Sequence, residues 1–210
     1  MTHHSHDEPL AGRRAAIMVG PMFEDSEALY PLYRLREAGA AVVVGPMFED
    51  SEALYPLYRL REAGAAVGVI GVEAGATVKG KKGHELEVEQ AADDLVAEDL
   101  DLLVIAGGYG PDKLRLDEGV LRLVRELSER GKPVAFICHA GWVPASAGIV
   151  AGRRVTSYPS IADDLRNAGA EWEDSEVVVD GNLISSRRPD DLPAFMRATI
   201  EVAAQAGAPA

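Results

Sequence analysis

The sequence predicts a doubly wound α/β fold, in which helices cover both faces of a mostly parallel sheet. Strand-like and helix-like segments alternate along the chain, which is the pattern of this fold class. The strand-like segments are short continuous apolar runs, which are typical of parallel strands buried on both faces. Two of these runs end at Gly107-Gly108 and at Cys138. In such sheets a ligand binds outside the carboxyl ends of the strands, so we expect the functional site there.

The first elements of the chain form a tandemly duplicated βα unit. Residues 19–42 read VGPMFEDSEALYPLYRLREAGAAV and recur without a mismatch at residues 44–67. Each copy, residues 15–39 and residues 40–64, reads as a strand, a loop and a helix. Such identity indicates a recent duplication, natural or engineered. Without one copy of 25 residues the chain of 210 has 185, the size of one domain.

The remaining elements follow in order after a polar, His-rich tail at residues 1–12, which we predict to be disordered. Val120, Leu123, Val124 and Leu127 recur at helical spacing, and Gly131 ends that helix. The predicted order is a hairpin (76–80 and 84–89), a strand (101–106), this helix, a strand (134–137), a short helix, a weak strand (155–157), a second hairpin (176–179 and 183–186) and a final helix (189–204). We therefore predict a single domain over residues 13–210.

The composition excludes several classes of function. The formal charge is −13, with 47% hydrophobic and 26% charged residues. Nucleic acids and anionic membranes bind basic surfaces, so neither is an expected partner. No apolar run approaches the length of a membrane span, and no signal peptide opens the chain. The one cysteine cannot form an internal disulfide, so we expect a protein of the reducing cytoplasm.

Cys138 stands where a nucleophile would be presented. Four apolar residues run directly into Cys138, and His139, Ala140 and Gly141 follow. A nucleophile elbow needs this order, which is a strand end, a reactive side chain on a tight turn and small neighbours. A helix start beyond the turn would lower the thiol pKa. The alternative is a buried core cysteine, which is common for a lone Cys.

A second strand end carries Gly107 and Gly108, whose backbone N–H groups could stabilise an oxyanion. An ordinary turn explains the glycines equally well. The segment matches neither a dinucleotide fingerprint nor a P-loop, so no cofactor is predicted. Asp112 begins the following helix, where the helix dipole alone favours an acidic residue.

A third segment, FEDSE, occurs in both copies and places Glu24 and Glu27, or Glu49 and Glu52, at a loop and a helix start. A carboxyl group aimed at the thiol could tune it, especially if burial keeps it protonated. The alternative is N-terminal helix capping by Ser26 or Ser51.

Histidines restrict the mechanism. Beyond the tail, where His3, His4 and His6 lack the framework of a metal site, only His84 and His139 occur. No His follows position 139, so a triad with a His far downstream of the cysteine is impossible. A histidine base must be His139 or, on the hairpin, His84.

Together these segments resemble the PfpI-type intracellular protease family. The resemblance rests on FEDSEALYPLYRLREAG, GKKGHELEV, AGGYGPDKLR, GKPVAFICHAGW and the stretch from GRRVTSYPSIADDL to ISSRRPDDLPAF, and it runs from about residue 13 to residue 200. That family belongs to the class I glutamine-amidotransferase-like superfamily, with the Parkinsonism-associated deglycase. The resemblance implies a flavodoxin-like sandwich and a homo-oligomer.

The resemblance also implies roles for residues. It implies a nucleophile at Cys138 with His139 beside it, and an acidic residue from a neighbouring subunit at Asp112, where the family usually has Glu. The carboxyl group that contacts the cysteine falls on Glu27 or Glu52. Only one copy of the unit can lie beside Cys138. If the second copy lies there, residues 1–39 become an N-terminal extension of the domain. We favour this arrangement, and with it Glu52. The family's CHGPW is Cys138-His139-Ala140-Gly141-Trp142 here.

Two functions follow. In the first, Cys138 attacks the carbonyl of a peptide-like substrate or of a small aldehyde such as a glyoxal, or of its adducts, at a site near a subunit interface. In the second, Cys138 is a redox sensor in a chaperone-like stress protein, and a nearby Glu holds the oxidised sulfur. A stress-related role is expected in both cases.

Overall fold

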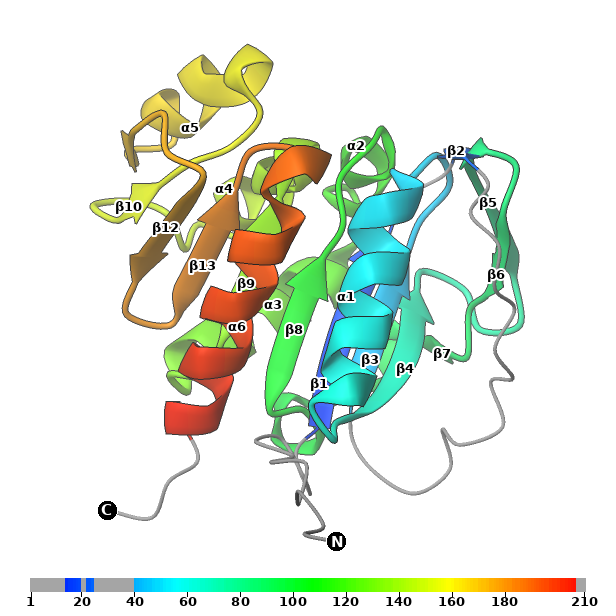
Figure 1. The fold of residues 1–210 in the computed structure, drawn as a ribbon. Coiled ribbons are helices and arrows are strands. Elements are labelled where there is room, and N and C mark those ends of the chain that lie inside the picture. The colour runs from blue at the N-terminus through cyan, green and yellow to red at the C-terminus, as the bar shows by residue number, and fades with distance from the viewer. Residues whose placement is uncertain (1–13, 20–21, 25–39, 207–210) are drawn as a thin grey trace, which may run out of the picture.

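A computed structural model describes residues 14–19, 22–24 and 40–206. Its largest sheet is mostly parallel, and only the β12–β13 pair is antiparallel (Figure 1). Within the described residues the strand order is β12 (Val177–Asp180), β13 (Leu183–Ser186), β9 (Val134–Ile137), β8 (Leu102–Ile105), β1 (Arg14–Val19), β3 (Ala40–Val44), β4 (Ala66–Gly71) and β7 (Gln90–Ala91).

Helices cover both faces of this sheet, as the alternating sequence pattern predicted. Figure 1 shows α1 (Asp50–Glu62) and α6 (Leu192–Ala206) in front of the sheet, with α3 (Glu118–Glu129) behind it. Successive residues of β8 pack alternately in two hydrophobic clusters, one on each face of the sheet. Leu102 and Val104 pack in the cluster that includes α1 and α6, whereas Leu103 packs in the cluster that includes α3. The apolar run of β8 is therefore buried on both faces.

Helix α3 forms where the apolar spacing predicted it. The Asp117 side chain accepts a hydrogen bond of 2.9 Å from the Val120 N–H and caps the helix. Beyond the last turn, Gly131 adopts a φ of 69°, the left-handed conformation that ends many helices. Burial of Val120, Leu123, Val124 and Leu127 fixes the helix against the sheet, at roughly 1.5–3 kcal/mol for each side chain.

Smaller elements complete the chain. The predicted first hairpin consists of β5 (Thr77–Lys82) and β6 (Glu85–Glu87), with β2 (Met22–Glu24) alongside β5. The weak strand expected at residues 155–157 is β10 (Arg154–Val155), which pairs with β11 (Glu171–Trp172). The expected final helix begins with a 3₁₀ turn (Pro189–Asp191) that leads into α6. The other helices are α2 (Gly110–Leu114), α4 (Trp142–Ser146) and α5 (Ala162–Asn167), and further 3₁₀ turns lie at Ala92–Asp94, Ala97–Asp99, Cys138–Gly141 and Pro159–Ile161.

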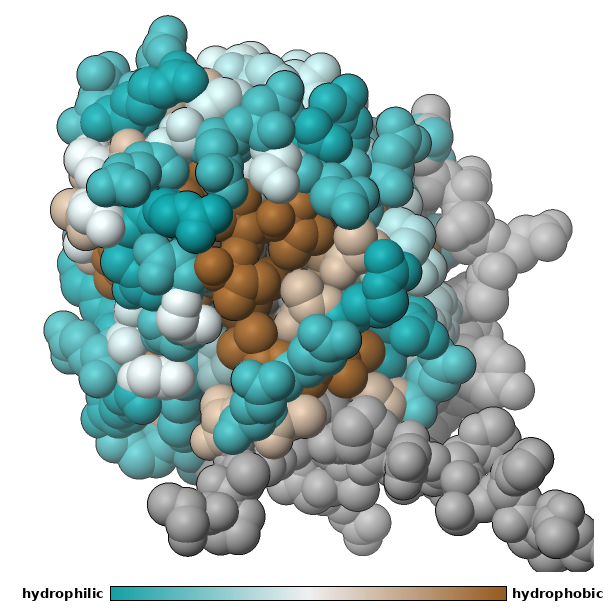
Figure 2. Space-filling view, turned by 60° about the vertical axis from the view of Figure 1, so that its left-hand side comes forward, coloured by the Kyte–Doolittle hydropathy of each residue, from teal (hydrophilic) through white to brown (hydrophobic). Residues whose placement is uncertain are grey.

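Apolar side chains also reach the surface where α6 meets the edge strand β12. Val177 and Val202 are partly buried against the cluster that includes α1 and α6, and Val179 is 41% exposed. Figure 2 shows hydrophobic residues gathered near the centre of that view and surrounded by hydrophilic ones. Across the described ranges, no helix is long and apolar enough to cross a membrane.

The two copies of the duplicated unit meet at one position in the sheet, between β4 and β8. Leu103 is the register partner of both Ala16 in β1 and Ala41 in β3. Ile70 is likewise the partner of both Met18 and Val43. The strand of the first copy therefore lies beside the same neighbours as that of the second, although residues 1–39 were expected to form an extension.

Only the second copy is described as a strand followed by a helix, β3 and α1. The helix expected in the first copy and Glu27 lie outside the described residues.

Because β1 and β3 share one position in the sheet, we predict that a single strand there is sufficient for the fold. Deletion of residues 20–44 joins Val19 to Gly45, and β1 keeps its register with both β4 and β8. We expect cooperative thermal unfolding with a Tm within about 4 °C of the full chain, a shift that corresponds to less than roughly 1–2 kcal/mol. Differential scanning calorimetry measures it. Loss of a cooperative transition would show that the sheet needs both strands.

Candidate active site

Cys138 lies on a strained turn at the carboxyl end of β9. It has a φ of 62°, in the left-handed region that a non-glycine residue rarely adopts. The 3₁₀ turn Cys138–Gly141 follows and leads into α4. The turn needs a small residue at Gly141, because a Cβ there would lie 3.2 Å from side-chain atoms of Ile161 and Leu165. The thiol is free, and the residue is 7% exposed.

Glu52 brings a buried carboxyl group to this turn from the first turn of α1. The Gly107 N–H donates a hydrogen bond of 2.9 Å to Glu52 Oε2, and Glu52 is fully buried. A Cβ at Gly107 would collide with Glu52 Oε2 and with the Cβ of Cys138. Glycine at position 107 therefore allows the ends of β8, β9 and α1 to meet.

Burial decides the protonation of both groups. It raises the pKa of Glu52 to about 8, with a further rise from Glu49, against the Gly107 hydrogen bond and the contact with Cys138. Burial, and then the neighbouring Glu52, raise the pKa of the Cys138 thiol. Backbone N–H groups of His139 and Gly108 oppose that rise, as does the charge of Lys81. At neutral pH the resting pair is therefore a thiol beside a protonated carboxyl group.

His139 places a proton acceptor beside the sulfur. Its Nδ1 lies 3.2 Å from Cys138 Sγ, and its Nε2 lies 3.1 Å from Ser160 Oγ. The ring stacks on Tyr158, with centroids 4.9 Å apart. Burial and then the charge of Lys81 lower the pKa of His139, so the imidazole is neutral at pH 7 and can accept a proton.

A tight turn before α1 fixes the loop that carries Glu49 and Glu52. Met47 has a φ of 77° and follows Pro46. The Tyr109 N–H donates to the Met47 carbonyl at 2.8 Å, and the Glu49 N–H donates to the Gly107 carbonyl at 3.1 Å. Gly108 itself has a φ of 84° and no space for a Cβ against this loop. Backbone hydrogen bonds therefore hold the FEDSE loop against the end of β8.

These groups line a cavity of about 380 Å³, which has both polar and apolar walls. Its lining residues are Glu49, Glu52, Lys81, Gly108, Tyr109, Cys138, His139, Tyr158, Ser160 and Pro189. A cavity of this size accepts a small molecule or one or two residues of a peptide. In the described part of the chain, no group of three or more His, Cys, Asp and Glu side chains could hold a metal ion.

The structure brings together Cys138, His139, Glu52 and Gly108, whereas Gly107 binds Glu52, and Asp112, expected to act from a neighbouring subunit, lies outside the cavity of its own chain. The N–H of Gly107 binds the Glu52 carboxyl group and is not available to an oxyanion. Asp112 is 53% exposed, pairs with Lys113 at 3.1 Å and does not line the cavity.

Sequence reasoning missed Lys81, Tyr158 and Ser160. The only available signals were GKKG in the predicted hairpin and TSYPS after the weak strand. Neither motif by itself indicates that its side chains reach the end of β9. His84, the second candidate base, is not among the residues that line the cavity.

Comparison with known proteins identifies the family of this chain. Residues 40–202 match the DJ-1/PfpI family, and the match starts at the second copy of the duplicated unit. The chain belongs to the DJ-1/PfpI family. It is 46% identical over 180 residues to a deglycase of Pyrococcus horikoshii, which covers 86% of this chain and 93% of that protein.

Relatives within the DJ-1/PfpI family carry different names. The chain is 42% identical over 190 residues to the putative cysteine protease YraA of Bacillus subtilis, covering 90% of this chain and 98% of that one. It is 43% identical over 191 residues to general stress protein 18 of the same organism, covering 90% and 96%. The crystal structure of Drosophila melanogaster DJ-1beta aligns with a TM-score of 0.72 and 28% identity, over 92% of this chain and 91% of that chain.

The protonated Glu52 predicts an unusual dependence of stability on pH. Its pKa of about 8 exceeds the unfolded value near 4.5, so the native state holds a proton that the unfolded state releases. The free energy of unfolding of the wild type then falls as the pH rises from 4.5, the unfolded pKa, to about 8, the native pKa. We expect Glu52→Gln to remove this loss. Between about pH 5 and pH 7, the free energy of unfolding of the wild type should fall. For the Glu52→Gln variant this fall should be smaller by roughly 2 kcal/mol.

Urea denaturation at several pH values measures this difference. Glu62→Gln is the matched control, because Glu62 is an exposed residue at the other end of α1. Parallel pH profiles for Glu52→Gln and the wild type would contradict a protonated Glu52.

Proposed function

We propose that this DJ-1/PfpI protein is a cysteine-dependent enzyme that acts on carbonyl substrates, of the deglycase or peptidase type. The observation that carries the proposal is the position of Cys138 on a left-handed turn, with His139 Nδ1 3.2 Å from its sulfur and the cavity in front of it. The names of the relatives, deglycase and putative cysteine protease, support the same chemistry.

The first chemical step follows from these positions. Neutral His139 takes the proton of the Cys138 thiol as the sulfur attacks the substrate carbonyl carbon, so a C–S bond forms and the carbonyl π bond breaks. Ser160 at Nε2 holds the ring in place. Because Glu52 is protonated at neutral pH, it places no negative charge beside the developing thiolate. With a peptide substrate, the C=O bond re-forms as the C–N bond breaks, and His139 gives its proton to the departing amine. With an aldehyde nothing departs, and His139 gives its proton to the oxygen of the thiohemiacetal.

The negative charge that develops on the substrate oxygen needs hydrogen-bond donors. The backbone N–H groups of Gly108 and His139 oppose the rise in the Cys138 pKa, so they act on the sulfur. Donors held this close to the nucleophile are in the region where an oxyanion forms. A bound aldehyde or acyl group would thus be held by backbone groups that need not reorganise.

Asp112 acts from a second subunit in this proposal, as the family resemblance implies. It is exposed on α2, and two exposed apolar residues of the same segment are Tyr109 at 57% and Leu116 at 75% exposure. Apolar side chains around an exposed acid suit a subunit interface. We infer a homo-oligomer in which Asp112 of one subunit approaches the cavity of its neighbour.

Removal of the thiol tests the enzymatic proposal. We expect Cys138→Ser to lower kcat/KM for methylglyoxal or for a fluorogenic peptide by at least about 10³-fold, and His139→Ala by about 10²-fold or more. Lactate formation and peptide fluorescence measure the two activities. A Cys138→Ser variant with wild-type activity, or a wild type inactive on both substrates, would contradict the proposal.

Mixed subunits test the role of Asp112. Asp112→Asn and Cys138→Ser are each expected to be inactive, because one lacks the acid and the other lacks the nucleophile. Co-refolding the two should restore activity to about a quarter of wild type, since some sites then combine an intact cysteine with an intact acid. Absence of any recovery, with mixed oligomers present in native mass spectrometry, would contradict an acid supplied by a neighbour.

The contact between Cys138 and Glu52 also favours a second candidate function, a redox sensor. A thiolate oxidised by two molecules of hydrogen peroxide becomes a sulfinate with release of two waters. The protonated Glu52 could donate a hydrogen bond to that sulfinate. Mass spectrometry after mild peroxide separates the two functions: the sensor requires oxidation of Cys138 ahead of the methionines.

A further inference from the structure

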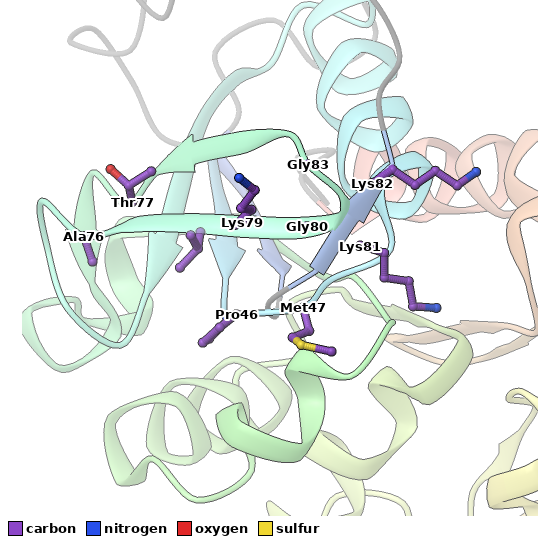
Figure 3. Close-up of a pocket in the computed structure, with 10 residues that line it drawn as sticks. Pro46, Met47, Ala76, Thr77, Lys79, Gly80, Lys81, Lys82 and Gly83 are labelled. Atoms are coloured by element: carbon purple, nitrogen blue, oxygen red, sulfur yellow. The ribbon is translucent and has the colours of Figure 1, made fainter.

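The cavity over Cys138 contains one permanent cation among the described residues that line it, Lys81. Lys81 lies near the end of β5, in the hairpin that the FEDSE loop contacts. The Lys81 N–H donates to the Phe48 carbonyl at 3.3 Å, which fixes the strand beside that loop. Figure 3 shows the Lys81 and Lys82 side chains extending from the end of the hairpin, with Pro46 and Met47 below the strand.

The partner of Lys81 is an accessible carboxylate. Lys81 Nζ lies 3.1 Å from Glu49 Oε2 and 5.5 Å from the centre of the Tyr109 ring. The side chains of Lys81 and Glu49 are 35% and 17% exposed. Ion pairs with this access to water contribute roughly 0–1 kcal/mol, so a second anion entering the cavity can compete with Glu49 for the ammonium group.

The other acidic groups at the cavity leave this charge available. Glu52 is protonated at neutral pH because burial raises its pKa to about 8. Burial lowers the pKa of Lys81, but the hydrogen bond and charge of Glu49 outweigh it and raise that pKa overall. Lys81 therefore stays charged, and Glu49 is the carboxyl group that pairs with it in the cavity.

The charge of Lys81 also reaches the reacting atom, since it stabilises the ionised form of the Cys138 sulfur. A charge that acts on the sulfur acts equally on a substrate group bound beside it. The hairpin adds two more lysines, Lys79 and Lys82, along a neighbouring cavity of about 790 Å³ that Lys81 also lines. Lys79 is paired with Glu85, and of these three lysines only Lys81 lines the cysteine cavity, so its charge is the one placed to attract an anion there.

We propose that Lys81 is a specificity-determining residue that binds a carboxylate on the substrate next to the carbonyl that Cys138 attacks. Glu49 holds the ammonium in position when the cavity is free, and the substrate carboxylate replaces it. The preferred substrates are then anionic carbonyl compounds such as oxo acids, in contrast to neutral aldehydes. This substrate class rests on the proposed carbonyl chemistry, but binding of the anion at Lys81 does not require turnover.

Because Cys138 is the only thiol of the chain, its alkylation reports on Lys81 directly. Iodoacetate and iodoacetamide have nearly the same shape and differ in charge. In both reactions the thiolate forms an S–C bond to the methylene carbon and iodide leaves. The ratio of the two second-order rate constants cancels the reactivity of the thiolate and measures attraction of the anion.

We expect Lys81→Met to lower the iodoacetate-to-iodoacetamide ratio by about tenfold, because the carboxylate loses its partner. Lys81→Arg should keep the ratio near the wild-type value. Glu49→Gln should raise it, because the competing carboxylate is gone. Lys79→Met is the matched control on the same strand, since Lys79 pairs with Glu85 at 3.4 Å and does not line the cysteine cavity.

A Lys81→Met ratio equal to that of the wild type, or a Lys79→Met ratio that falls as far, would overturn the proposal. Turnover separates this outcome from the proposed function. Glyoxylate and methylglyoxal are anionic and neutral compounds of similar size, and Lys81→Met should lose more kcat/KM on glyoxylate. If neither compound is turned over while the alkylation ratio still falls, the anion site stands and the enzymatic proposal fails. If methylglyoxal is turned over while the ratio does not change, the anion site fails alone.

Discussion

The burial of the Glu52 carboxyl group is the constraint on which the site depends. Its hydrogen bond from the Gly107 N–H, 2.9 Å long, joins the first turn of α1 to the end of β8, and its contact with Cys138 joins both to β9. A buried carboxylate without a cation is costly, so the group stays protonated. One retained proton thus allows three elements to meet without a second buried negative charge beside the thiol.

The same constraint explains the strain around the site. Cys138 and Met47 are the two non-glycine residues with positive φ in the described chain, and they lie on the turns that face each other across Gly107 and Gly108. Each such conformation costs about 1 kcal/mol or more, and the buried strands on either side hold it in place. The strained turn at the end of β9 places Cys138 among the residues that line the cavity.

Much of this architecture could be predicted from sequence because its signals are local. Apolar runs predicted β8 and β9, helical spacing predicted α3, and small residues after Cys138 predicted the elbow. Lys81 could not be predicted, because its place at the site depends on how the hairpin packs against the FEDSE loop. The hydrogen bond from the Gly107 N–H to Glu52 could not be predicted either, because it joins residues 55 positions apart in the sequence. For the duplication, sequence identity alone could not show which copy approaches Cys138, and the structure brings Glu52 of the second copy there.

The pKa of Glu52 tests the central claim most directly. Side-chain ¹³C NMR of the glutamates, with Glu52→Gln to assign the resonance, follows its titration in the native protein. We expect a carboxyl group that remains protonated at pH 7 and titrates at about 8. Titration near the ordinary value of 4.5 would contradict it, because the thiol would then face a carboxylate and not a neutral carboxyl group.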